Sequence, residues 1–300
     1  MNAHKRRVSS KSSESAATVV LLVPTMILVG VVLFVPTIYV AIYSFFDWDP
    51  NGSSPFVGLD NYVDVLSSAS FQTVMKNQAY LLLGMPLWVM VPLLITFLLY
   101  EDTKAPGLWR SIYFFPSVLS PALVGILFRT LLATDGPLNE SLRLVGLDYL
   151  ARDWLTSPHL VKPVIIVLVL WAGVGTGVVI FSAALSAVPV EIFEAAKIDG
   201  AGWWTRMWRI ALPSIRDSIF LWMAFQVLAL FLFMFGWIFV LTGGGPGLSS
   251  TTIDYLIYQE VFRSRFFPTA AAMSVLLILV LLVLLGLPAA LVRRRFEATK

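Results

Sequence analysis

The residues with the clearest chemical pattern lie at 194–204, in the sequence EAAKIDGAGWW. Two carboxylates, Glu194 and Asp199, lie there among alanine and glycine. A carboxylate accepts charge-assisted hydrogen bonds from basic groups, and small residues let a second backbone approach closely. The pattern favours a surface that docks another protein. Catalysis inside the membrane would need paired acids or a nucleophile with its base in the apolar segments, and none is present there.

The remaining polar residues exclude several kinds of site. The chain has no cysteine, which excludes thiolate metal sites, iron–sulfur clusters and cysteine nucleophiles. Its two histidines, His4 and His159, are far apart in the sequence, so we predict no metal site. The glycine run LTGGGPG at 241–247 lacks the lysine of a phosphate-binding loop. We therefore predict no catalytic residue, no cofactor on this chain and no nucleic-acid partner.

Apolar segments must position this charged loop. Hydrophobic residues make up 58% of the 300 residues and charged residues only 13%, against about a quarter in a soluble domain. Six runs have at least 22 residues, enough for a helix across a hydrocarbon core of about 30 Å. We predict an all-α membrane protein with six transmembrane helices. Their ranges are 19–42, 79–100, 111–133, 164–185, 218–241 and 269–291.

The basic residues predict the orientation of these helices. With a cytoplasmic N-terminus, the inner segments are 1–18, 101–110, 186–217 and 292–300. The outer segments are then 43–78, 134–163 and 242–268. The inner segments carry 14 of the 21 Lys and Arg residues and the outer ones carry six, so both termini are predicted to be cytoplasmic. The first apolar run is 24 residues long, too long for a secretory signal, and we interpret it as a retained anchor.

The inner loop at 186–217 is predicted to form two short helices on the cytoplasmic surface. Pro189 suits the start of the first helix, and Gly200 suits its end, because glycine adopts the left-handed conformation without strain. An amphipathic piece, WWTRMWRI, follows, with Arg206 and Arg209 expected to face water. Pro213 is expected to open the fifth span.

Three motifs carry a family resemblance. The sequence EAAKIDGAGWWTRMWRIALP at 194–213 resembles the loop of importer-type ABC permeases, in which E-A-A-x-x-x-G precedes I-x-L-P. LTGGGP at 241–246 and FVGLDNYVDVL at 56–66 are similar to the carbohydrate-uptake branch. Within that branch, the larger maltose-type or glycerol-phosphate-type subunit of the permease pair is the most similar. The resemblance covers roughly residues 20–292.

The resemblance implies one half of a type I ABC importer, with an accessory first helix at 19–42 and a permease core at 79–291. The helix at 189–199 would be the coupling helix, docked in a cleft of a separate ATPase subunit. The residues assigned to this contact are Glu194, Ala195, Ala196, Asp199, Gly200 and Ala201.

The same resemblance implies the partners. They are a second EAA-type permease forming a heterodimer, two ATPase subunits that bind ATP and magnesium, and an extracytoplasmic solute-binding protein. The chain itself would then be no enzyme, and it would lie in the plasma (inner) membrane of a prokaryote. A sugar or oligosaccharide is the expected substrate, with glycerol phosphate or another small polar solute as the alternative. A passive channel or an ion-coupled carrier is disfavoured, because we find neither charged midplane residues nor an inverted repeat.

Polar and aromatic residues inside the spans are candidates for the substrate pathway, because sugars are held by hydrogen bonds and aromatic faces. These candidates are Ser117, Trp171, Thr176, Gln226, Phe233 and Trp237. Structural explanations compete with this interpretation: small residues pack helices together, hydroxyls bond their own backbone, and aromatic residues face lipid. Both interpretations remain open for each residue.

Overall fold

The computed structural model describes residues 22–101 and 106–297, and this part of the chain is almost entirely helical. Four helices are long and apolar enough to cross a membrane: Leu22–Tyr43, Ala69–Tyr100, Val161–Ser186 and Phe267–Gly286. Two further pairs of helices meet the same criterion together, although each pair is bent. If each bent pair is one span, the described residues contain six spans, the predicted number, although the second pair, Trp203–Ser214 with Arg216–Leu232, takes its first helix from the predicted inner loop.

The spans and their connections are built from the following elements. The helices of the spans are α2 (Val35–Tyr43), α4 (Ala69–Leu82), α5 (Met85–Glu101), α6 (Pro106–Val118), α7 (Pro121–Leu131), α9 (Val161–Ser186), α13 (Arg216–Leu232) and α16 (Phe267–Glu297). The helices of the connections are α3 (Asp60–Ser67), α8 (Pro137–Leu144), α10 (Val190–Ile198), α11 (Trp203–Arg206), α12 (Leu212–Ser214), α14 (Phe235–Leu241) and α15 (Ile253–Gln259).

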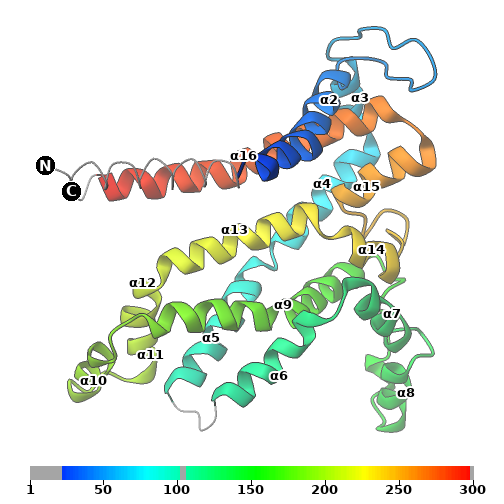
Figure 1. The fold of residues 1–300 in the computed structure, drawn as a ribbon. Coiled ribbons are helices and arrows are strands. Elements are labelled where there is room, and N and C mark those ends of the chain that lie inside the picture. The colour runs from blue at the N-terminus through cyan, green and yellow to red at the C-terminus, as the bar shows by residue number, and fades with distance from the viewer. Residues whose placement is uncertain (1–21, 102–105, 298–300) are drawn as a thin grey trace, which may run out of the picture.

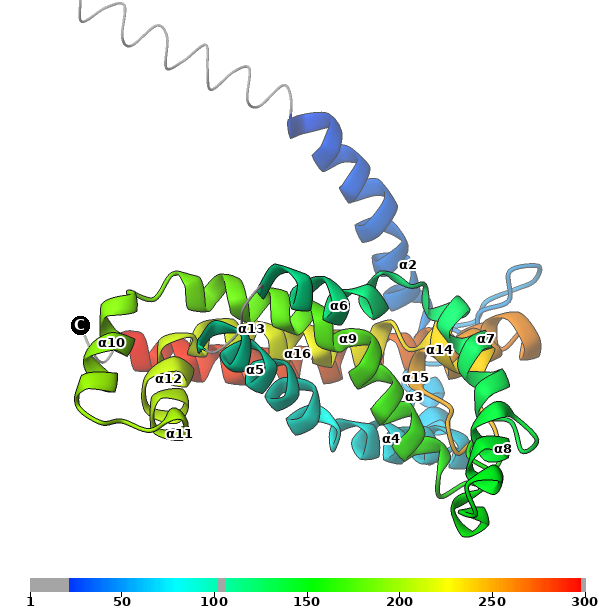
Figure 2. The ribbon, with the colours of Figure 1, turned by 90° about the horizontal axis from the view of Figure 1, so that it is seen from below.

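The connecting helices gather at two opposite ends of the molecule (Figure 1). α10, α11 and α12 lie at one end, which we call the α10 end, and α7, α8 and α14 lie at the other, the α14 end. α16 runs toward the α10 end in both views (Figures 1 and 2). The predicted docking loop and the later part of α16 therefore lie at the same end of the fold.

The segment predicted as the third span, 111–133, is two helices at a right angle. α6 ends at Val118 and α7 begins at Pro121, with a bend of 90° between them. Proline has no N–H to continue the ladder of α6, and the Ser120 side chain caps α7 by accepting from the Leu123 N–H at 3.3 Å. The apolar composition continues through this break, and hydropathy alone therefore does not reveal it.

The segment predicted as the fifth span, 218–241, is also divided. α13 ends at Leu232, and after two residues the chain continues as α14, beginning at Phe235. Pro213 does not open this span but lies in α12, and the segment Trp203–Ser214 meets α13 at 75°. The helical core of the fifth span is therefore α13 alone.

Other predicted boundaries shift by smaller amounts. The second span, predicted at 79–100, begins ten residues earlier, at Ala69, where Ser68 caps α4 by accepting from the Phe71 N–H. The fourth, predicted at 164–185, is α9. The last, predicted at 269–291, is α16, which continues as helix into the predicted tail. The predictions made for residues 1–21, 102–105 and 298–300 fall outside the described part of the chain.

The first span lies at the edge of the fold, as predicted for an added outer helix. None of its most apolar window is buried within the chain. Its end is anchored by aromatic contacts: the Trp48 ring lies 5.2 Å from that of Tyr43 and 5.5 Å from that of Phe267, at the start of α16. The helix is therefore attached near the α14 end and leaves the rest of its surface free.

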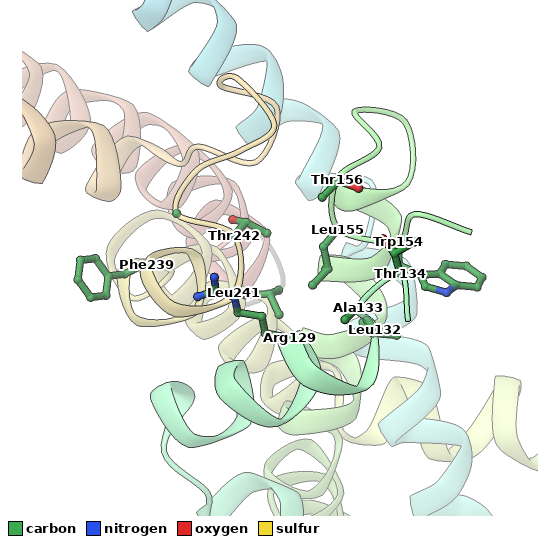
Figure 3. A pocket seen from close by; sticks show the side chains of 11 residues that line it. Arg129, Leu132, Ala133, Thr134, Trp154, Leu155, Thr156, Phe239, Leu241 and Thr242 are labelled. Atoms are coloured by element: carbon green, nitrogen blue, oxygen red, sulfur yellow. The ribbon is translucent and has the colours of Figure 1, made fainter. Parts of the chain in front are cut away.

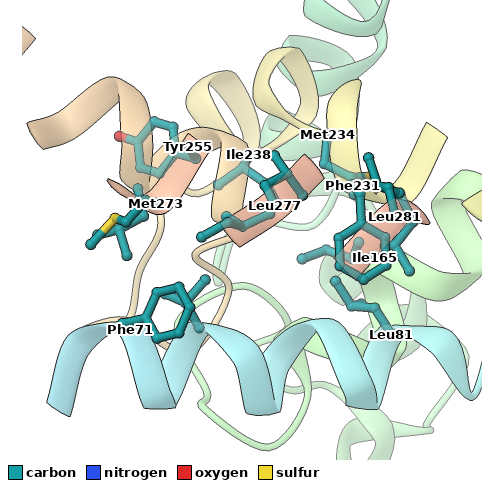
Figure 4. Packing of buried hydrophobic residues seen from close by; sticks show 14 of the residues in the cluster. Phe71, Leu81, Ile165, Phe231, Met234, Ile238, Tyr255, Met273, Leu277 and Leu281 are labelled. Carbon is teal, nitrogen blue, oxygen red and sulfur yellow. The ribbon is translucent and has the colours of Figure 1, made fainter. Parts of the chain in front are cut away.

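Two large apolar clusters hold the remaining spans together in the described part of the chain, and a smaller one of Leu99, Val174 and Val178 joins α5 to α9. The larger lies where α4, α9, α13, α15 and α16 meet, and its side chains point toward one another in Figure 4. Its buried members include Phe71, Leu81, Ile165, Phe231, Tyr255 and Leu277. The second lies at the α10 end and includes Phe97, Phe181, Phe193, Met207 and Trp222. The two ends of the fold therefore have separate cores.

Two buried indoles connect the helices between these clusters. Trp88 Nε1 on α5 donates to the Ile166 carbonyl on α9 at 3.0 Å. Trp222 Nε1 on α13 donates to the Trp88 carbonyl at 2.9 Å. A buried indole N–H needs a partner, and these two bonds join α5 to α9 and α13 to α5, spans that are not consecutive in the chain.

Close packing of α6 on α9 generates a prediction about stability. A Cβ at Gly175 would overlap the backbone of Tyr113 and Phe114, whereas a Cβ at Gly173 would meet nothing within 4 Å. Gly175→Ala should therefore lower the stability of the solubilised protein by about 1–3 kcal/mol, the usual cost of overpacking. Gly173→Ala is the matched control and should unfold at the parent temperature. Equal melting temperatures for the two variants would contradict the described contact.

Candidate functional site

α10, the predicted docking helix, is anchored by one buried side chain. Pro189 is its N-cap, one residue outside the helix it was expected to start. Phe193 is 2% exposed, and its ring lies 6.2 Å from Phe97 and 5.2 Å from Tyr100. Both partners belong to the end of α5, and α10 is therefore held directly against a span.

Gly200 ends α10 in the left-handed conformation, which confirms the prediction. Its φ is +77°. The Ala201 N–H donates to the Ala196 carbonyl at 2.9 Å and the Gly200 N–H to the Lys197 carbonyl at 3.1 Å, the two bonds of a Schellman motif. The Arg206 guanidinium donates to the Ala201 carbonyl. The expectation that Arg206 faces water is therefore wrong, because this side chain turns back to close the loop.

The second helical piece has one inward and two outward tryptophans. The Trp203 ring lies 4.9 Å from that of Phe97, within the same cluster as Phe193. Trp204 and Trp208 are 60% and 53% exposed. Arg209 is exposed, as predicted. This distribution suits a segment that lies at a membrane surface, with aromatic rings at the interface and a charge toward water.

The six predicted contact residues do not share a single exposed face. Glu194, Ala195, Asp199 and Gly200 are exposed, whereas Ala196 and Ala201 are half-buried. Ala196 lies three residues after Phe193 and so shares the side of α10 that faces the spans. The free side of α10 therefore presents the carboxylates and Ala195.

Three aliphatic side chains extend this free surface. Val190, Ile192 and Ile198 are 51%, 45% and 87% exposed. They lie on a short helix with two glutamates and a lysine, outside all the spans. Exposed apolar surface rimmed by charged residues is typical of a protein-interaction site. The free face of α10 is thus apolar at its ends and acidic between them.

The anchor side of α10 belongs to the same core as three spans. Phe193 and Met207 pack in one cluster with Leu185 at the end of α9, and with Ile215 and Trp222 at the start of α13. Phe97 adds α5 to this cluster. One packed body at the α10 end is therefore formed by α10 and the adjoining ends of α5, α9 and α13.

The six candidate pathway residues have different surroundings. Gln226 is 6% exposed, Trp171 is 38% exposed and Phe233 is 64% exposed. Ser117 is half-buried, and its Oγ is buried without a hydrogen-bond partner among the described residues. Thr176 and Trp237 are half-buried. Their exposure alone assigns none of them to a pathway, and their roles remain predictions.

Several polar residues that were not predicted hold the α14 end together. Asn77 Nδ2 donates to the carbonyls of Leu248 and Thr251, at 2.7 and 3.1 Å, and Lys162 Nζ donates to Asn77 Oδ1 at 3.2 Å. Gln78 Nε2 donates to the Leu230 carbonyl at 3.2 Å. The signal available in the sequence was this pair of adjacent amide side chains, Asn77 and Gln78, directly before the apolar run at 79–100.

Asp254 is a further buried polar residue at this end. Its carboxylate accepts from the Phe235 N–H at 2.6 Å, from the Tyr255 N–H at 2.9 Å and from the Thr252 hydroxyl at 2.6 Å. Burial raises the pKa of Asp254 above its usual value, and these three hydrogen bonds oppose the shift. Asp254 therefore caps the starts of both α14 and α15.

A pocket of about 410 Å³ also opens at the α14 end (Figure 3). It lies between the end of α7, the segment 132–134, the segment 154–156 and the chain that follows α14. Its polar lining residues are Arg129, Thr134, Trp154, Thr156 and Thr242. Arg129 is the only charged residue in this lining. The pocket and the free face of α10 therefore lie at opposite ends of the molecule.

Comparison with known proteins decides between the kinds of membrane protein that this arrangement allows. Residues 1–297 match the family described as the binding-protein-dependent transport system inner membrane component. The chain belongs to this family. The resemblance drawn from the three motifs is thereby confirmed, and the permease is a membrane component of a transport system.

Two relatives and one solved structure extend the comparison. A probable ABC transporter permease protein of Pyrococcus horikoshii is 31% identical over 279 residues, covering 91% of this permease and 94% of the relative. The multiple sugar-binding transport system permease protein of Streptococcus mutans is 30% identical, covering 87% and 89%. A chain of a bacterial ABC transporter involved in the import of the acidic polysaccharide alginate has the same fold, with a TM-score of 0.83, 24% identity and coverage of 96% and 99%. The predicted fold class is thus confirmed.

The turn at Gly200 generates a second prediction. Gly200→Val should strain the left-handed position by about 1–2 kcal/mol and release the end of α10, although a Cβ there meets nothing within 4 Å. Amide hydrogen exchange at 196–201 should therefore become faster in the purified permease. Gly202→Val is the matched control, because Gly202 is extended, with φ −66° and ψ 164°, and is equally unobstructed. Equal exchange in the two variants would show that the turn does not hold α10.

Proposed function

We propose that this permease forms half of the translocation pathway of an ATP-driven importer for a sugar or an oligosaccharide. The observation that carries the proposal is the partly apolar, acidic free face of α10, anchored to three spans of a chain from a binding-protein-dependent transport family. The Streptococcus mutans relative, named for a multiple sugar-binding system, supports the substrate class. Glycerol phosphate or another small polar solute is the alternative.

The proposed assembly is a heterodimer with a second EAA-type permease, two ATPase subunits and an extracytoplasmic binding protein. The permease has no phosphate-binding loop sequence, and ATP and magnesium are therefore assigned to the ATPase subunits. The excess of basic residues in the inner segments supports cytoplasmic termini in a prokaryotic plasma (inner) membrane. The α10 end is then cytoplasmic, and the α14 end with its pocket faces outward.

The free face of α10 is assigned to contact with the ATPase. Glu194 and Asp199 offer carboxylates to basic groups, Ala195 allows close approach, and Ile198 supplies apolar area. When the ATPase pair closes on ATP, α10 moves with it. Because Phe193 and Trp203 both pack against Phe97, this displacement reaches the inner end of α5.

The two broken spans indicate where the solute passes. α7 and α14, the segments beyond the breaks, pack closely on each other, since a Cβ at Gly125 would lie 3.1 Å from Val240 Cβ. Backbone that leaves a helix at membrane depth is tolerated only where protein covers it or it lines an aqueous cavity. Phe233, 64% exposed in the second break, is the predicted pathway residue that this reasoning favours.

Reconstitution tests the proposed function. The permease, its partner permease, the ATPase and the binding protein are placed in proteoliposomes, and uptake of radiolabelled oligosaccharides and of glycerol phosphate is measured. We expect saccharide uptake that requires both ATP and the binding protein. Uptake down a gradient without ATP would indicate a passive channel, and uptake that follows an imposed ion gradient would indicate a carrier.

The contact with the ATPase generates a separate prediction. Ile198→Ala should weaken ATPase binding by roughly 10- to 100-fold, the factor for about 1.5–3 kcal/mol of aliphatic burial. Lys197→Ala is the matched control: Lys197 is also exposed, but it lies one turn after Phe193, at a different angle around α10 from Ile198. Titration of the solubilised permease pair with the purified ATPase measures both. Equal loss of affinity in the two variants, or none in either, would contradict the assigned contact.

A further inference from the structure

The break between α13 and α14 is held by side chains from two other helices. α13 ends at Leu232 and α14 begins at Phe235. The Leu230 carbonyl, in the last turn of α13, accepts from Gln78 Nε2 on α4 at 3.2 Å. The Phe235 N–H, at the start of α14, donates to the Asp254 carboxylate at 2.6 Å. A continuous helix would pair these groups internally, and here each is paired with a side chain.

Gln78 and its neighbour hold the chain on both sides of α14. Gln78 is 1% exposed and Asn77 is 3% exposed. Gln78 bonds the end of α13, whereas Asn77 bonds the carbonyls of Leu248 and Thr251, which follow α14. Two adjacent amides of α4 therefore fix the segment before the break and the segment after α14.

Gln78 also keeps an unused polar atom. Its Oε1 is buried and has no hydrogen-bond partner in the part of the chain that the structure describes. A buried acceptor without a donor is unfavourable, and an apolar side chain of the same shape would avoid that cost. The hydrogen bond from Gln78 to the Leu230 carbonyl offsets the cost of this unpaired acceptor.

We propose that Gln78 is a positioning residue of the transport cycle. By bonding the Leu230 carbonyl it holds the end of α13, and with it Phe233, and so sets how readily the break opens to water. The inference rests on the proposed function, which places this break along the pathway. Gln78 acts through the backbone of α13, and contact with the solute belongs to other residues.

The natural absence of cysteine makes the break directly measurable. Leu232→Cys, at a position 41% exposed at the end of α13, supplies a single thiol beside the break. The complete transporter carrying this reporter is reconstituted, and a membrane-impermeant maleimide is added with and without ATP. Adding Gln78→Met preserves the length of the side chain and removes both polar atoms. We expect labelling to become about fivefold faster and uptake to fall, while the ATPase still co-purifies.

The matched control is Gln72→Met, which makes the same change on the same helix. Gln72 is exposed, and its Nε2 donates to the nearby Leu66 carbonyl, at 3.0 Å. Its labelling rate and uptake should equal those of the reporter protein. A general loosening of α4 would change labelling and uptake in both variants, whereas the proposed role of Gln78 changes them only in Gln78→Met.

A second variant tests the hydrogen bond without changing the shape of the side chain. In Gln78→Glu, the introduced carboxyl can donate to the Leu230 carbonyl only when it is protonated. Relative to Gln72→Met at each pH, its labelling should therefore slow as the pH falls. This titration tests the hydrogen bond even if the transporter carrying Gln78→Met does not assemble. A ratio of the two labelling rates that does not depend on pH would overturn the proposal.

The outcomes separate this inference from the proposed function. Absence of labelling at Leu232→Cys in every nucleotide state would show that water does not reach the break, and the pathway assignment would fail together with the role of Gln78. Labelling that is equal in Gln78→Met and Gln72→Met would overturn the role of Gln78 and leave the pathway assignment in place.

Discussion

The arrangement of the α14 end of this protein depends on the pairing of backbone hydrogen bonds in an apolar medium. An N–H or C=O group left unpaired in hydrocarbon costs several kcal/mol, and a continuous helix avoids that cost. Two spans of this permease are interrupted, and side chains compensate at each interruption. Ser120 caps α7, Gln78 pairs with the end of α13, and Asp254 pairs with the start of α14. The breaks are therefore specific features of the sequence.

The α10 end is organised by aromatic packing. One ring of α5, that of Phe97, contacts both Phe193 of the first loop helix and Trp203 of the second. The loop thus has two points of attachment to the same span, and Gly200 lies between them. The opposite side of α10 stays free, with Ile198 largely exposed. A helix of nine residues in this way separates its attached side from its exposed side.

Much of this architecture was predictable, and the physical reasons for the exceptions are clear. Six apolar runs indicate six spans because length and composition suffice for that inference. Gly200 was predictable because few residues other than glycine occupy a left-handed helix end. Hydropathy, however, carries no information on the direction of the helix axis, so it does not distinguish a bent segment such as 111–133 from a straight one. Asn77 and Gln78 fall in the predicted outer segment 43–78, and their role was not predictable because their partners, among them Leu230, are distant in the sequence.

The surface of α10 was predictable only in part. The motif locates the loop, but the burial of Ala196 and the inward turn of Arg206 depend on how α10 rests against α5. That contact is made by Phe193, which lies outside the small-residue motif. Conversely, Ile198 looks like an ordinary core residue in the sequence, but it is 87% exposed among the described residues.

The lack of burial in the first helix has a consequence for how the protein is made. A helix satisfies its own backbone hydrogen bonds, and an apolar one is therefore stable in lipid without neighbours. Leu22–Tyr43 needs no later segment to cover it, since none of its apolar window is buried within the chain. It can leave the insertion machinery and settle in the bilayer while the remaining spans are still being synthesised. The direction in which it settles then constrains the threading of every span that follows.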